Sequence, residues 1–238
     1  MMLKQIFETQ KFNDNEIIRL WDPPVALDGI IEPKCWINVA VKVLWILKEQ
    51  NAGGSENEVF DHRQYFRECA GSNPSWKSTA GNIARVSYGI LNKIYDPEKI
   101  PKIGIDQNEG FAVVGDHDIF CDLAIINVKK TAGGSVADGH RLVSDYAIEA
   151  HKKFILQQID FIDPDIIINC HHVDSLLKDL ANCPVHEFEN HQTGCRWKRN
   201  GKRLVIDAYH PQATNMTGNQ YCEAIFDAVQ TDEKLVKG

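Results

Sequence analysis

Four stretches of the chain are almost continuously apolar, and we predict that each forms a buried β-strand. They are residues 36–48 (WINVAVKVLWILK), 122–127 (DLAIIN), 165–170 (DIIINC) and 203–209 (RLVIDAY). Valine, isoleucine and leucine fill neighbouring positions, whereas a strand with one solvated face alternates apolar and polar residues. The pattern therefore indicates a sheet that is covered on both faces.

Between these stretches, apolar residues recur with the spacing of helices. The predicted helices are residues 58–69, 79–94, 140–162, 173–180 and 219–229. Strands that alternate with helices are typical of βαβ crossovers. We expect an α/β fold: a three-layer αβα sandwich with a mainly parallel, roughly four-stranded central sheet. Residues 1–238 are expected to form one domain, with residues 1–34 partly peripheral to it.

A basic segment precedes the fourth predicted strand. Asn200-Gly201 predicts a tight turn, so Arg196 to Arg203 is expected to form a hairpin. This segment carries five positive charges and no negative one, in a chain whose net charge is −7. An acidic chain is unlike a general nucleic-acid binder, which needs clustered lysine and arginine. The local basic hairpin fits contact with a short stretch of phosphate backbone.

Composition indicates in which compartment the protein is expected. No apolar run reaches the roughly 18 residues that a membrane helix needs, and the first residues lack a signal-peptide pattern. The seven cysteines are scattered and include no CxxC pair, which favours reduced thiols. We therefore expect a cytoplasmic protein without a membrane partner.

A group of histidines and cysteines lies between residues 170 and 195. Its members are Cys170, His171, His172, Cys183, His186, His191 and Cys195. No cysteine pair has the close spacing of structural zinc sites, and the stretch includes a predicted strand and helix. We therefore predict no metal site, and a metal-dependent hydrolase is the weakest of the functions considered.

The loops after the four strands hold the candidate chemistry, because ligands of parallel sheets bind beyond the carboxyl ends of the strands. Gly53-Gly54 and Gly133-Gly134 lie in the first two of these loops. Paired glycines let the backbone approach a phosphate closely, although they also occur in ordinary strand-to-helix turns. The third loop begins with His171-His172 and the fourth with His210.

In order and placement, these loops resemble the motifs of the uracil-DNA glycosylase superfamily. Lys48-Glu49-Gln50-Asn51-Ala52 resembles its first motif, Gly-Gln-Asp-Pro-Tyr-His or Gly-Glu-Ala-Pro-Gly. Asn127 resembles the asparagine that ends a strand and reads the base, and His210-Pro211-Gln212 resembles a late His-Pro-Ser. The similarity runs from about residue 36 to 215. Lys48, Asn51 and Gln212 depart from the usual Gly, Pro and Ser, and the cysteines of the iron–sulfur branch are missing, so no cofactor is expected.

The resemblance implies hydrolysis of the N-glycosidic bond of uracil or another damaged base in DNA, either single-stranded or flipped from a duplex. Catalysis would use Glu49 to position water and stabilise the sugar cation, and His210 to donate to the departing base oxygen. Asn127 would read the Watson–Crick edge, accepting from N3–H and donating to O4.

The remaining site predictions follow the same loops. Gln50 and Asn51 would contact the base, and Trp76 would stack on it, with Tyr65 and Phe66 as alternatives. The predicted phosphate contacts are Gly53, Gly54, Lys129, Lys130, Gly133, Gly134, Pro211, Gln212, Lys198 and Arg199. Each residue also has an ordinary structural explanation, such as a helix cap, a strand end or a solvated charge. The alternative function is therefore a catalytically silent module that binds a nucleobase, nucleic acid or protein.

Overall fold

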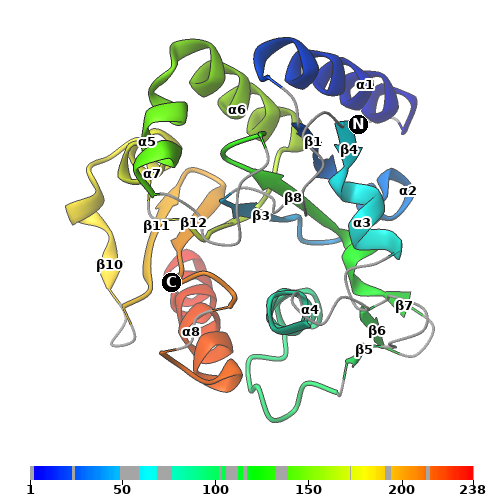
Figure 1. Cartoon of the computed structure of the whole chain (residues 1–238). Helices are drawn as coiled ribbons and strands as arrows, with labels where there is room; N and C mark the ends of the chain where they lie inside the picture. The colour runs from blue at the N-terminus through cyan, green and yellow to red at the C-terminus, as the bar shows by residue number, and fades with distance from the viewer. Residues whose placement is uncertain are drawn as a thin grey trace.

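The computed structural model has a seven-stranded mixed sheet at its centre (Figure 1), with strand order β10-β11-β12-β9-β3-β8-β2. It describes residues 3–22, 25–48, 59–68, 77–101, 103–105, 112–114, 117–131, 139–171, 173–190, 194–212 and 215–237. The strands are β2 (Gly29–Ile30), β3 (Val43–Leu47), β8 (Leu123–Asn127), β9 (Ile166–Asn169), β10 (Glu189–Asn190), β11 (Arg196–Asn200) and β12 (Arg203–Asp207). The expected mixed α/β fold is confirmed, but the sheet is larger than the predicted four strands.

The middle of this sheet is parallel and its edges are antiparallel. Strands β12, β9, β3 and β8 pair in parallel, whereas β2, β11 and β10 run antiparallel to their neighbours. The four parallel strands come from the four apolar stretches of the sequence. Strands β2 and β10 were missed because they are too short to show a pattern. Strand β11 (RWKRN) is mostly polar and was expected only as one arm of the hairpin.

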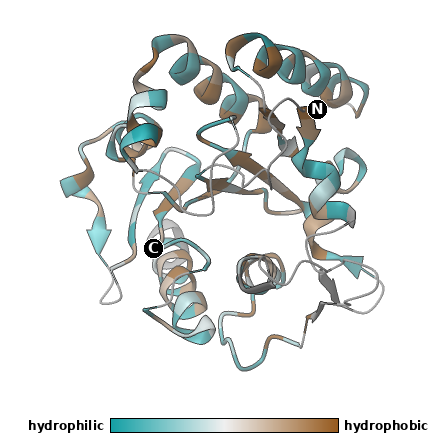
Figure 2. Ribbon diagram, viewed as in Figure 1, coloured by the Kyte–Doolittle hydropathy of each residue, from teal (hydrophilic) through white to brown (hydrophobic). Residues whose placement is uncertain are grey.

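Helices cover both faces of the sheet (Figure 1). One face carries α1 (Leu3–Leu20), α5 (Gly139–Ala147), α6 (Glu149–Ile162) and α7 (Asp174–Ala181), and the other carries α4 (Lys77–Asn92) and α8 (Gly218–Lys237). Strand β3 shows why both faces are apolar, since Leu44 and Ile46 join one core and Trp45 joins the other. The strands at the centre are accordingly the most hydrophobic part of Figure 2.

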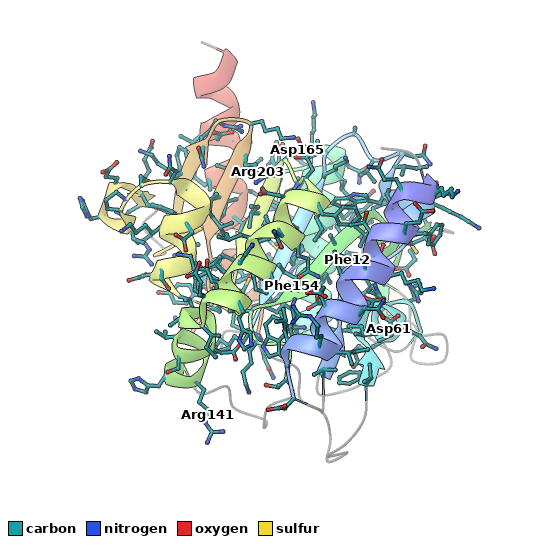
Figure 3. All side chains as sticks on the ribbon, turned by 90° about the horizontal axis from the view of Figure 1, so that it is seen from above. Phe12, Asp61, Arg141, Phe154, Asp165 and Arg203 are labelled. Carbon is teal, nitrogen blue, oxygen red and sulfur yellow. The ribbon has the colours of Figure 1, made fainter. Side chains whose placement is uncertain are left out.

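The N-terminal helix α1 is only partly peripheral. Ile6 and Ile17 are buried in the core that lies beneath α6, while Phe7 and Phe12 remain exposed on the outer side. Figure 3 looks down on this helix layer and shows Phe154 between α6 and α1. The Phe154 ring meets Trp21 edge-on, with 5.5 Å between the ring centroids.

Smaller elements surround the main sheet. Strands β1 (Val25–Leu27) and β4 (Val59–Asp61) form a parallel pair, and β5 (Gly104–Ile105), β6 (Ala112–Val114) and β7 (His117–Asp118) form an antiparallel sheet. Two short helices, α2 (Pro33–Trp36) and α3 (His62–Glu68), and two 3-10 turns, η1 (Ile119–Asp122) and η2 (Val185–Glu187), complete the fold. In the described part of the chain, no helix is long and apolar enough to span a membrane.

Three predicted boundaries were wrong. The strand predicted over 36–48 is limited to β3, because Pro33 begins a helical turn that includes Trp36 and in which the Glu32 side chain accepts the Lys34 N–H. The helix predicted from residue 58 begins only after β4, and the one over 140–162 divides at Ile148. The predicted hairpin is confirmed: Asn200 pairs with Arg203, and Gly201 takes the left-handed backbone of its turn, with φ of 57°.

Candidate functional site

The carboxyl ends of β3, β8, β9 and β12 meet at one edge of the sheet, because these strands are parallel. Backbone hydrogen bonds continue past the strand ends there: Val128 N–H donates to the Leu47 carbonyl at 3.0 Å, and Ala208 N–H to the Asn169 carbonyl at 2.9 Å. We call this region the carboxyl edge. The loops that follow these strands therefore leave from a shared rim.

Several predicted site residues lie outside the described residues. They are Glu49, Gln50, Asn51, Gly53, Gly54, Trp76, Gly133 and Gly134. The predictions that the structure does describe are Asn127, Lys129, Lys130, Lys198, Arg199, His210, Pro211 and Gln212.

Asn127 ends β8 and is completely buried. Its backbone N–H donates to Asp28 Oδ2 at 2.7 Å, and its side-chain Nδ2 lies 3.0 Å from Nδ1 of His62. Within the described part of the chain, its Oδ1 has no hydrogen-bond partner. A buried carbonyl oxygen without a donor is unfavourable. The backbone and the Nδ2 group of Asn127 are therefore both fixed, with Oδ1 left as the acceptor for a ligand.

His62 is a residue of this site that the sequence analysis missed. It is the first residue of α3, and burial lowers its pKa to about 4, so the imidazole is neutral at pH 7. Its Nδ1 accepts the Asn127 amide and thereby orients it. In the sequence, the start of α3 is marked by Asp61, whose carboxylate caps the helix by accepting from the backbone N–H of Arg63 and Gln64. Because the helix prediction began at residue 58, this helix start was hidden.

Lys130 does not contact phosphate, and that prediction is corrected. Its side chain is fully buried, and its Nζ lies 2.8 Å from both Asp28 carboxylate oxygens and from Gln158 Oε1. Burial lowers the pKa of the ammonium group, while the Asp28 charge opposes this effect. Asp28 also accepts from Gln158 Nε2 at 2.9 Å. We call Asp28, Lys130 and Gln158 the buried polar triad; it anchors the backbone of Asn127.

His210 lies just after β12 and is half-buried. Strands β9 and β3 separate β12 from β8, the strand that ends at Asn127. Its Nδ1 accepts the backbone N–H of Gln212 at 3.2 Å, which places the proton of the neutral ring on Nε2. Burial, assisted by the positive charge of Lys48, lowers the His210 pKa to about 4. His210 is therefore a neutral imidazole whose Nε2–H is a hydrogen-bond donor.

The loop of His210 is braced from α4. Asn82 Nδ2 donates to the Pro211 carbonyl at 2.6 Å, and Pro211 itself is buried. Proline has no N–H, and the N–H of Gln212 points at the imidazole. The backbone of these two residues therefore positions His210 and offers no free N–H to a phosphate, while the exposed Gln212 side chain keeps its predicted phosphate contact as a prediction.

Lys48 connects the two halves of the carboxyl edge. It follows β3, between the strand of Asn127 and that of His210, and its carbonyl accepts the Lys129 N–H at 3.1 Å. Its ammonium is close enough to His210 to lower the pKa of that imidazole. Glu49, the predicted carboxylate, is the next residue along the chain.

The basic hairpin does not join this site. Its turn, at Asn200 and Arg203, lies at the amino end of β12, whereas His210 follows the carboxyl end. Arg199 is paired with Asp232, and Lys198 donates to the Glu187 carbonyl at 3.4 Å. The other cations of the hairpin are also compensated: Arg196 by Asp207, Lys202 by Asp163 and Arg203 by Asp160. The phosphate contacts predicted for Lys198 and Arg199 are thus not part of the carboxyl edge.

The aromatic and thiol side chains near the site are part of the hydrophobic core. Phe66 is buried against Phe120, with 5.1 Å between the ring centroids, so its face is not open to a base. Cys195 is buried, and burial raises its pKa to about 12. Among the residues described, no three His, Cys, Asp or Glu side chains are grouped so that they could hold a metal ion.

The chain matches no protein-family model, and no curated protein matches its sequence. Function is therefore inferred from the side chains of the carboxyl edge. They offer a buried acceptor, Asn127 Oδ1, and a neutral donor, His210 Nε2–H.

Proposed function

We propose that this protein hydrolyses the N-glycosidic bond of uracil or a related damaged base in DNA. The observation that supports the proposal is the pair of unlike groups on the carboxyl edge. They are the Oδ1 of Asn127, which accepts no hydrogen bond from the residues that the structure describes, and the neutral imidazole of His210. An acceptor is needed to read a base, and a donor is needed where charge develops as the base leaves.

Asn127 would select the base by hydrogen bonding. Uracil carries an N–H at N3, which can donate to the Oδ1 of Asn127, whereas cytosine has a lone pair at that position and would place two acceptors face to face. The Nδ2 group has a second hydrogen, beyond the one directed at His62, that can donate to O4. The same orientation would accept other bases with an N–H at the matching position, such as hypoxanthine or xanthine.

His210 would stabilise the departing base. As the bond between C1′ of the sugar and the base nitrogen breaks, its electron pair moves to the base and negative charge gathers on a carbonyl oxygen. The Nε2–H would donate to that oxygen, a contribution of about 3–4 kcal/mol to the barrier. Water would then add hydroxide to C1′ and leave a proton for the base, with Glu49 as the proposed carboxylate for this step.

Release of free base from synthetic DNA tests the proposal. Single-stranded oligonucleotides that contain uracil, hypoxanthine or xanthine would be incubated with the protein, without added metal, and the released base measured by chromatography. We expect His210→Ala to lower the rate roughly 100-fold or more, the usual effect of losing one such donor. His186→Ala, at an exposed histidine of η2, is the matched control and should keep full activity. Absence of base release from all three substrates would exclude the enzymatic proposal.

A second candidate, base binding without chemistry, is favoured by the charge distribution. The arginines of the hairpin are paired with aspartates and the chain carries a net charge of −7, so few cations are left for a DNA backbone. Binding of a uracil-containing oligonucleotide should then survive Glu49→Gln, with no base released by the unaltered protein. The affinity for the oligonucleotide should change little with salt concentration, because this salt dependence grows with the number of phosphates that lysine and arginine neutralise.

A further inference from the structure

A cavity of about 610 Å³ lies on the flank of the molecule where α1 faces α2 and α3. It is beside the β2 edge of the sheet, since Gln10 and Ile31 both line it and Gln10 is bonded to the Ile30 carbonyl. His210 follows β12, on the other side of β9, β3 and β8 in the strand order. The cavity is therefore separate from His210, although two of its lining residues, Asp61 and Arg63, flank His62 in the chain. It is large enough for a small-molecule ligand.

Gln10, one of the residues that line the cavity, carries an unsatisfied polar atom. Gln10 is 8% exposed, and its Nε2 donates to the Ile30 carbonyl at 2.9 Å. That bond fixes the carboxamide, and among the described residues its Oε1 has no partner. Buried acceptors are nearly always satisfied in folded proteins. A ligand with an N–H or O–H group would supply the missing donor.

The wall beside Gln10 is a closed ion network. The Arg63 side chain is 7% exposed. Its guanidinium donates two hydrogen bonds to the Asp14 carboxylate, at 3.0 and 2.9 Å, and two to the Asp61 carboxylate, at 2.8 and 2.9 Å. Figure 3 shows Asp61 next to α1, the helix that carries Asp14. Because Arg63 occupies both carboxylates, this wall is rigid and contributes only one net negative charge.

The rim is more positive than this wall. Lys11, Lys34 and Arg67 line the cavity, and none of the three has a carboxylate partner in the described ranges. The Arg67 guanidinium donates to the Ile31 carbonyl at 2.5 Å, which holds the group in place and keeps its charge. Glu32 is the other carboxylate of the lining, so three cations face one unpaired acid at the rim. A bound anion is favoured there.

The mouth of the cavity carries an aromatic ring. Phe7 is 48% exposed and lines the cavity, although large apolar side chains are usually buried. An exposed aromatic beside cations is the combination that binds nucleotides, since bases stack on rings and phosphates pair with lysine and arginine.

We propose that this cavity binds a nucleotide, with the base stacked on Phe7, a base N–H donating to Gln10 Oε1 and the phosphate held by Lys11, Lys34 and Arg67. The nucleotide is either free or part of a single strand, since both present the same groups. This site does not depend on the glycosylase proposal, because none of its residues belongs to the carboxyl edge.

Binding would be measured by equilibrium dialysis with radiolabelled deoxyuridine and deoxyadenosine monophosphates and with a five-nucleotide oligomer. Phe7→Ala and Lys11→Gln should each weaken binding about tenfold, through lost stacking and a lost phosphate contact. Phe12→Ala and Lys4→Gln are the matched controls, because both residues are exposed on α1 and neither lines the cavity. Tighter binding of the oligomer than of the monophosphates would identify a strand as the source of the nucleotide.

The outcomes separate this inference from the proposed function. Binding that Phe7→Ala weakens and His210→Ala leaves unchanged would support the cavity, whether or not free base is released. Three results would overturn it. The first two are no binding of any of these nucleotides at millimolar concentration, and equal losses in the Phe7 and Phe12 variants. Ribose 5-phosphate that binds as well as the nucleotides would also overturn it, because stacking would then contribute nothing.

Discussion

His210 illustrates how two neighbours set the chemistry of one residue. The Gln212 N–H selects the tautomer, and burial together with the Lys48 charge keeps the ring neutral. The sequence identified His210 and Asn127 as candidates because each lies where an apolar strand ends, which is where parallel sheets bind ligands. It could not identify His62, because the contact with Asn127 joins residues that are far apart along the chain.

Lys48→Met should raise the pKa of His210 above its value of about 4. A nearby cation disfavours a second positive charge, so its removal makes protonation of the imidazole easier. Burial is the larger cause and remains, so the pKa should stay below the usual value of about 6.5. NMR titration of the imidazole protons measures this shift. Lys178→Met, at an exposed position of α7, is the control, and an unchanged His210 pKa in the Lys48 variant would contradict the assignment.

The helices and strands that were predicted share a property: their apolar residues repeat within a short stretch of the sequence. Helix α4 (Lys77–Asn92) and the strand cores repeat apolar residues at fixed spacing, so a short window reveals them. Strand β11, with only Trp197 buried, has no apolar pattern of its own, and the sequence indicated it only through the Asn200-Gly201 turn that joins it to β12. Helix α1 was missed because few of its positions are apolar and its buried face includes Gln10 and Asn13.

Helices α4 and α8 pack closely at Gly89, and Gly89→Ala should destabilise the protein. A Cβ there would lie 2.3 Å from Phe226 Cζ and 2.7 Å from the Ile94 carbonyl oxygen. Overpacking of this kind costs about 1–3 kcal/mol, more than the roughly 1 kcal/mol that alanine gains over glycine in a helix. Urea unfolding measures the difference. Gly139→Ala in α5, where a Cβ would meet nothing within 4 Å, should be neutral or stabilising.

The buried polar triad ties the β2–β8 edge to α6, and its parts should be strongly coupled. Lys130→Met leaves the Asp28 carboxylate buried without its cation, which should lower the free energy of unfolding by about 3–5 kcal/mol. Asp28→Asn combined with Lys130→Met removes both charges and should cost less than the lysine change alone. Urea denaturation of the single and double variants tests this. Additive losses would show that the ion pair does not link the two positions.

For the whole molecule, the neutral state of His62 makes stability depend on pH. Its pKa is about 4 in the folded protein and roughly 6.5 when unfolded, so the unfolded chain takes up the proton first as the pH falls. The contribution of His62 to the free energy of unfolding is complete above pH 6.5 and is lost between pH 6.5 and 4; it amounts to about 3 kcal/mol. His62→Gln should remove about half of the loss between pH 7 and 4.5, because His210, whose pKa is also lowered to about 4, contributes a similar part. Urea unfolding at the two pH values measures the loss. An equal loss in both proteins would exclude His62 as its source.

The parallel centre of the sheet also determines when the chain can fold. Val43 of β3 pairs with Leu123 and with Ile166, and β12, the outer parallel strand, comes from residues 203–207. Contacts between such distant segments form slowly, since long loops must close first. During synthesis, β9 must wait with an open hydrogen-bonding edge until β12 has left the ribosome, and over that interval the nascent chain is most exposed to aggregation and most in need of a chaperone.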